Sequence, residues 1–121
     1  MLSQRRWQRE RELMEQHLPE FEWFAEPPRF GFQGYLKGER TRKLYEVVLE
    51  AYENEYPSVA PVVFMNPRVG SHWYNGNGIH GVDRYYQDPI LCVIKAWNPA
   101  LSSFANTLLA VIKYLHEWDG R

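Results

Sequence analysis

The sequence predicts an α+β domain in which a helix near each end of the chain packs on one side of an antiparallel meander of strands. Apolar residues recur at helical spacing near both ends. Between them, apolar and polar residues alternate, and a long stretch rich in Gly, Asn and Asp then separates the last strand from the second helix. At 121 residues the chain is too short for two cores, so residues 1–121 form a single domain.

Composition limits the classes of function. Hydrophobic residues make up 45% and aromatic residues 16% of the chain, which is enough to build a packed core. The net charge of -1 does not favour a nucleic acid or a membrane as the main partner. One cysteine cannot form an internal disulfide, and the first residues do not resemble a signal peptide. We therefore expect a cytoplasmic protein, and we expect no cofactor.

The first helix is expected over residues 3–18. Ser3 is placed to cap it and Pro19 closes the pattern. The apolar residues of this segment share one broad face: Trp7, Leu13, Met14 and Leu18. Arg5, Arg6 and Arg9 lie mostly outside that face. Either this charged face is simply solvated, with Arg6 paired to Glu10 and Arg9 to Glu12, or these arginines present a basic docking surface to a protein partner.

The strands follow an aromatic cluster at residues 21–24 and the pair Pro27-Pro28, which stops any helix. Period-two alternation predicts a strand over residues 30–36 and a second over 45–51, in which Glu46 and Glu50 face away from the apolar side. The polar residues 37–41 turn the chain between these two strands. A third strand is expected over residues 61–65.

The second helix is expected over residues 103–118, with Ser102 or Ser103 as its cap. Its apolar residues recur at offsets of three and four and should pack on the sheet, with Leu108 and Ile112 buried.

The residues that favour a functional site lie between the last strand and the second helix, because binding and catalytic groups concentrate on such loops. The only cysteine, Cys92, stands in a short apolar run, and His72 and His80 precede it. A lone cysteine is most often a buried apolar residue. These three side chains also suggest a zinc-dependent hydrolase, but their long, irregular spacing is not typical of a zinc site, so we expect no metal.

Four short motifs, in this order, resemble those of ubiquitin-conjugating enzymes. Residues 56–63, Tyr-Pro-Ser-Val-Ala-Pro-Val-Val, are similar to the Tyr-Pro-x-x-Pro-Pro-x-Val of that family, and His72 stands where it has His-Pro-Asn. Residues 77–79, Asn-Gly-Ile, resemble its Asn-Gly-x-Ile, and residues 97–100, Trp-Asn-Pro-Ala, its Trp-x-Pro-Ala. The resemblance covers about residues 3–118. The two usual C-terminal helices of the family are missing, as in compact conjugating-enzyme-like proteins of bacterial operons, including antiviral ones.

The resemblance implies a UBC-like fold, with a meander flanked by an N-terminal helix and a C-terminal cross-over helix, and implies roles for particular residues. Cys92 would be the nucleophile if residues 81–90 are an insertion before the family's cysteine; otherwise His80 occupies that position and the protein is an inactive variant. Trp73 and Tyr74 replace Pro and Asn of the family triplet, so Asn75 or Asn77 would have to stabilise the oxyanion. His72 would organise the loop, and Glu117 or Asp119 lies near the family's lysine-orienting carboxylate.

The resemblance also implies partners. An active enzyme would accept a ubiquitin-like protein, or a related protein C-terminus, as a thioester from an activating enzyme and pass it to an amine of a target protein. Arg5, Arg6 and Arg9 would dock the activating enzyme. An inactive variant would instead bind a protein partner through its sheet face or its first helix.

Overall fold

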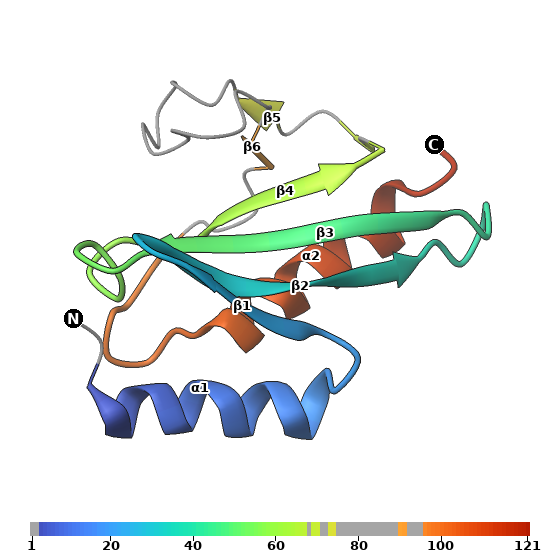
Figure 1. Ribbon diagram of the computed structural model, residues 1–121. Coiled ribbons are helices and arrows are strands. Elements are labelled where there is room, and N and C mark those ends of the chain that lie inside the picture. The colour runs from blue at the N-terminus through green and yellow to red at the C-terminus, as the bar shows by residue number, and fades with distance from the viewer. Residues whose placement is uncertain (1–2, 68, 71–72, 75–89, 92–95) are drawn as a thin grey trace.

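The architecture is α+β, as the sequence predicts, in a computed structural model that describes residues 3–67, 69–70, 73–74, 90–91 and 96–121 (Figure 1). In chain order the elements are α1 (Gln4–His17), β1 (Glu22–Glu26), β2 (Arg29–Lys37), β3 (Leu44–Tyr52), β4 (Val62–Asn66), β5 (Trp73–Tyr74), β6 (Ile90–Leu91) and α2 (Phe104–Trp118). Strands β1 to β4 form an antiparallel meander in the order β1-β2-β3-β4. Strands β5 and β6 pair with each other, and β6 lies against β4.

Both helices begin at the serines that the sequence offers as caps. The side chain of Ser3 accepts a hydrogen bond from the Arg6 N–H at 3.1 Å, and that of Ser103 accepts one from the Asn106 N–H at 3.0 Å. Such bonds satisfy amide groups that have no partner within the helix itself. The expected bounds of both helices are therefore confirmed to within a residue.

The core lies between one face of the sheet and both helices, which Figure 1 shows on the same side of the meander. Period-two alternation brings Phe30 and Phe32 of β2 to this face together with Val47 and Leu49 of β3, where all four side chains are buried. From α2, Leu108 is fully buried as expected. Ile112 is only half-buried at the edge of this core, so the expectation that it is buried was too strong.

Strand β1 was not predicted. Residues 22–26 carry three consecutive apolar side chains between glutamates, which is not the alternation of a half-buried strand. Trp23 packs toward the helices, with its ring 4.0 Å from that of Trp7, whereas the guanidinium of Arg29 lies over the Phe24 ring. Side chains on both faces of the strand thus have contacts, and the meander has four strands in place of the expected three.

Glu50 lies on the face of the sheet opposite the helices, as the alternation predicts, and it is buried there. Its carboxylate forms an ion pair with Arg29 at 2.8 Å. The reason is a second apolar cluster on that face, made by Tyr52, Val62 and Phe64, which buries the ion pair beside it.

Neither α1 nor α2, the helices of the described part of the chain, is long and apolar enough to cross a membrane.

Candidate functional site

The predicted catalytic residues lie outside the described residues, and so do residues 81–89 of the proposed insertion. These residues are His72, Asn75, Asn77, His80 and Cys92. The structure instead defines the chain that leads into this stretch and the chain that follows it. We call residues 96–103, between Cys92 and α2, the exit segment.

The chain entering the stretch is held by α2. The hydroxyl of Tyr114 donates a hydrogen bond to the Val69 carbonyl at 2.8 Å. The next residue, Gly70, has a φ of 77°, and a Cβ added to it would lie 1.8 Å from the Tyr114 hydroxyl oxygen. Only glycine satisfies both the left-handed backbone and this close approach. The start of the stretch is thus tied to α2.

The exit segment is folded by its own polar residues. The Asn98 side-chain oxygen accepts a hydrogen bond from the Ala100 N–H at 3.0 Å, and the Ser102 hydroxyl oxygen accepts one from the Asn98 N–H at 3.1 Å. Asn and Ser side chains commonly stabilise turns in this way, by bonding backbone a few residues away. The segment therefore forms a turn that ends at the cap of α2.

Trp97 ties the exit segment to the turn that precedes β4. Its indole N–H donates to the Pro57 carbonyl at 2.6 Å, and its ring centroid lies 5.7 Å from that of Tyr56. Two of the motifs that carry the family resemblance, 40 residues apart in the sequence, are thus in direct contact.

Two arginines of α1 also hold the exit segment through its carbonyl groups. The guanidinium of Arg6 donates to the carbonyl of Pro99 and, at 2.6 Å, to that of Ser102. Arg9 donates to the Ala100 carbonyl at 2.9 Å and more weakly to the Leu101 carbonyl at 3.2 Å. A planar guanidinium with several donors suits such a cluster of acceptors.

Glu10 joins these elements from a completely buried position on α1. Its carboxylate accepts hydrogen bonds from the Arg6 Nε at 3.0 Å, from the Tyr56 hydroxyl and from the Phe104 N–H at 3.0 Å. Because Phe104 is the first residue of α2, Glu10 also places a negative charge at the positive end of that helix dipole. One carboxylate thereby connects α1, α2 and the Tyr56 turn.

Electrostatics keep Tyr56 and Arg6 in fixed protonation states. Burial, together with the Glu10 carboxylate, raises the pKa of the Tyr56 hydroxyl, so it stays protonated and donates. Burial alone would lower the pKa of Arg6, but its contacts with Tyr56 and Glu10 outweigh that effect and raise the pKa. Arg6 is therefore a permanent cation beside a carboxylate.

The structure separates the three arginines of the expected docking surface. Arg6 pairs with Glu10 as predicted, but it and Arg9 also bond the exit segment. The expected pair of Arg9 with Glu12 does not form. Arg5 is exposed and makes no ion pair or hydrogen bond within the described residues.

Asp119, one of two late acids that the resemblance suggested, holds the β2–β3 turn instead of facing the exit segment. Its two oxygens accept from the amides of Arg40 at 2.9 Å and Thr41 at 3.1 Å, and from the hydroxyls of Thr41 at 2.6 Å and Tyr45 at 2.8 Å. These donors, above all the Thr41 hydroxyl, hold the pKa of Asp119 below its usual range. The other candidate, Glu117, is exposed on α2.

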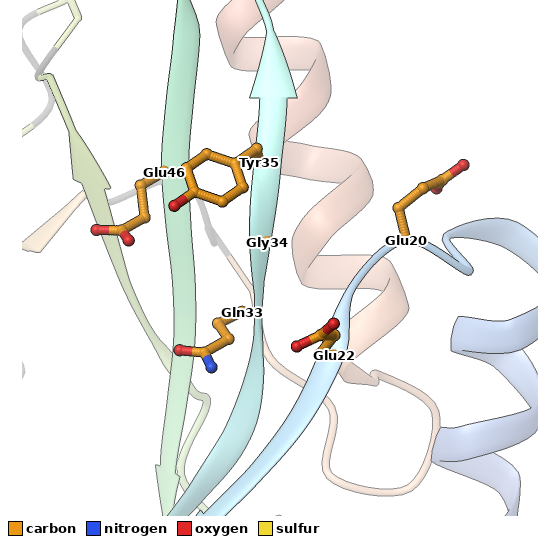
Figure 2. A pocket seen from close by; sticks show the side chains of 6 residues that line it. All are labelled: Glu20, Glu22, Gln33, Gly34, Tyr35 and Glu46. Carbon is orange, nitrogen blue, oxygen red and sulfur yellow. The ribbon is translucent and has the colours of Figure 1, made fainter.

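A shallow hollow lies on the face of the sheet opposite the helices, and we call it the acidic hollow (Figure 2). Its volume is about 310 Å³, and it is lined by Glu20, Glu22, Gln33, Gly34, Tyr35 and Glu46. The carboxylates come from three places: the chain before β1, β1 itself and β3 (Figure 2). They do not converge on one point, and no group of His, Cys, Asp or Glu among the described residues could hold a metal ion.

Sequence reasoning missed Glu10 as a site residue and assigned it to a solvated face. A signal was present, because Glu10 precedes Met14 by four residues and follows Trp7 by three, both on the apolar face. A carboxylate on the buried stripe of a helix needs internal donors. The cationic partner on the same helix was predicted, but Tyr56 and Phe104 could be found only from the fold.

No protein-family model, curated protein or solved structure matches this chain.

Proposed function

We propose that this chain is a compact ubiquitin-conjugating-like enzyme that carries a ubiquitin-like protein, or a related protein C-terminus, as a thioester on Cys92. The observation that carries the proposal is the contact between two motif segments, in which Trp97 of Trp-Asn-Pro-Ala donates to the carbonyl of Pro57 in the Tyr-Pro motif. The element order supports it as well. A helix, an antiparallel meander, a site stretch and a second helix follow one another, which is the order that the family resemblance implies.

The chemistry that we propose for Cys92 is two successive acyl transfers. In the first, the Cys92 thiolate attacks the carbonyl carbon of a thioester on an activating enzyme; a new C–S bond forms and the activating enzyme leaves as its thiolate. In the second, an amine of the target attacks the same carbonyl carbon. A C–N bond forms, the C–S bond to Cys92 breaks, the sulfur leaves as thiolate, and the ammonium proton passes to solvent.

We propose that the activating enzyme docks on the N-terminal part of α1. Of the three arginines expected there, Arg5 is the best probe because Arg6 and Arg9 also bond the exit segment. Reversing the charge of Arg5 tests docking without removing a contact of that segment. The effect on loading should grow as the salt concentration falls, because surface charges are less screened.

The decisive experiment mixes the protein with an activating enzyme, its modifier and ATP. We expect a covalent adduct that a thiol reductant cleaves, because a thioester exchanges with free thiolate. Cys92→Ser should yield either no adduct or an ester that resists the reductant, while His80→Ala should still form the thioester. If no reductant-sensitive adduct forms, and if Cys92 in the native protein also resists alkylation, the enzymatic proposal is wrong.

A second candidate, a catalytically inactive binding module, is favoured by the face of the sheet opposite the helices. Tyr35 and Leu44 are each 62% exposed on that face, beside the acidic hollow. A partner with basic and apolar side chains would complement it. This candidate requires that Cys92 is not the nucleophile, so the same adduct assay decides between the two.

A further inference from the structure

Arg6 occupies an unusual position for a helix arginine, because a single guanidinium connects a buried carboxylate to the backbone of a distant segment. Its side chain is only 11% exposed. On one side the Nε atom pairs with Glu10 at 3.0 Å; on the other the two terminal nitrogens donate to the carbonyls of Pro99 and Ser102. Those carbonyls belong to residues more than 90 positions away in the sequence.

We infer that Arg6 is a positioning residue for transfer from Cys92, acting through the exit segment; this rests on the proposed function. The exit segment is the described chain that follows Cys92 in sequence. Its carbonyls have no cation other than Arg6 and Arg9 bound to them within the described residues. Arg6 therefore fixes the described part of the chain that follows the nucleophile, and its proposed effect on transfer is indirect.

The orientation of Arg6 is itself fixed, which a positioning role requires. Glu10 is fully buried, and it is bonded to Tyr56 and to the Phe104 N–H at 3.0 Å as well as to Arg6. The carboxylate consequently cannot turn with the arginine. Since Phe104 begins α2, the contact points of Arg6 on the exit segment are set relative to both helices.

Arg9 makes a weaker version of the same contact. Its donors reach the carbonyls of Ala100 and Leu101 on the exposed side of the exit segment, and no carboxylate among the described residues pairs with it. Exposed bonds of this kind compete with water and hold geometry less firmly. The positioning role thus falls mainly on Arg6.

A lysine cannot replace Arg6 in this role. The three donor groups of Arg6 reach Glu10, Pro99 and Ser102 at once because the guanidinium is planar and forked. A lysine ammonium at the same place is a single point charge that can keep the ion pair or a carbonyl contact, but not the whole set. Arg6→Lys therefore retains the charge and loses the geometry.

The test separates positioning from docking by measuring only the second transfer. The Cys92 adduct is formed first, the activating enzyme is removed, and the release of the modifier to free lysine is followed in a single turnover at increasing lysine concentration. Arg6→Gln and Arg6→Lys are compared with Arg11→Gln, an exposed arginine of the same helix that has no contact with the exit segment.

We expect the maximal release rate of Arg6→Gln to fall by about 10- to 100-fold, the scale of a small misplacement of reacting groups. Arg6→Lys should fall between Arg6→Gln and the wild type, and Arg11→Gln should release at the wild-type rate. The lysine concentration for half-maximal rate should stay constant, because Arg6 does not touch the amine.

Three results would overturn the inference, and they differ from one another. Wild-type rates in both Arg6 variants would refute it while leaving the proposed function intact. A loss of rate that matches a loss of folded protein, measured by circular dichroism on the same samples, would make Arg6 a stability residue only. If even the wild type forms no adduct, the proposed function fails first and the positioning role fails with it.

Discussion

Replacing Glu10 with Ala should destabilise the fold more than any exposed substitution on the same helix. The carboxylate is completely buried and accepts from Arg6, Tyr56 and Phe104. After truncation, Arg6 keeps the carbonyls of the exit segment and some contact with water. The Tyr56 hydroxyl proton and the Phe104 N–H lose their acceptor in a buried place.

The magnitude follows from these lost partners. A buried donor without an acceptor costs about 1–3 kcal/mol, so the two donors together cost about 2–6 kcal/mol. Removing one partner of a buried ion pair costs about 3–5 kcal/mol by comparison with other proteins. The two estimates describe the same loss and are not summed, so we expect about 3–5 kcal/mol for Glu10→Ala. Glu10→Gln keeps an acceptor oxygen and should cost less.

Urea unfolding followed by tryptophan fluorescence measures this change, with a shift in midpoint at constant slope as the sign of a pure stability effect. Glu12→Ala is the control, because Glu12 is exposed on the same helix and, among the described residues, accepts a hydrogen bond only from Gln8. Its effect should stay within about 0.5 kcal/mol. If Glu10→Ala were as mild as this control, the carboxylate would not organise the network.

A double-mutant cycle sharpens the test. Tyr56→Phe alone removes one donor to Glu10 and should cost about 1 kcal/mol. In the Glu10→Ala background it should cost little, or even restore stability, because the hydroxyl it removes has already lost its acceptor. Equal costs in both backgrounds would mean that the two groups do not interact.

Two further predictions concern α2 and its end. Leu108→Ala should lower the free energy of unfolding by about 2–5 kcal/mol, because Leu108 is fully buried. Ile112→Ala should lower it less, because Ile112 is half-buried. Equal thermal midpoints for both variants and the wild type would contradict this packing. The pKa of Asp119 is lowered in the folded state, so its contribution to stability is complete above the unfolded value near 3.9 and is lost as the pH falls below it. Asp119→Asn should therefore reduce the free energy of unfolding at pH 7, and this free energy should fall less steeply below about pH 4 than it does in the wild type. Urea unfolding across that pH range measures both effects. A fall as steep as that of the wild type would contradict the role given to Asp119.

The regular elements were largely predictable because each depends on a local pattern. Ser3 and Ser103 begin the helices, and the alternating residues of β2 and β3 face the core as expected. Strand β1 was missed since its apolar side chains find contacts on both faces, so its sequence lacks alternation. Local patterns identify surfaces that need burial, but they do not say how many such surfaces a segment has.

The contacts of the candidate site were much less predictable. The sequence suggested that Glu10 pairs with Arg6 on a solvated face and that Glu50 faces away from the apolar side, but it did not predict that both are buried in ion pairs. Their charges are compensated by residues brought near by the fold, such as Tyr56 for Glu10. The roles of His72, Asn75, Asn77, His80 and Cys92 remain predictions from the sequence, because these residues lie outside the described part of the chain.

Under the two proposals, docking and positioning fall on neighbouring residues of α1. Arg5 faces solvent, whereas Arg6 turns inward to Glu10 and the exit segment. Glu10 also accepts a hydrogen bond from the first residue of α2, so the position of α1 relative to α2 is already fixed. A partner that binds at Arg5 would therefore contact a helix that is held in place. Docking should then raise the loading rate without shifting the exit segment. Reversal of the Arg5 charge should accordingly slow loading and leave release unchanged, whereas Arg6→Gln should slow release even from an adduct that is already formed.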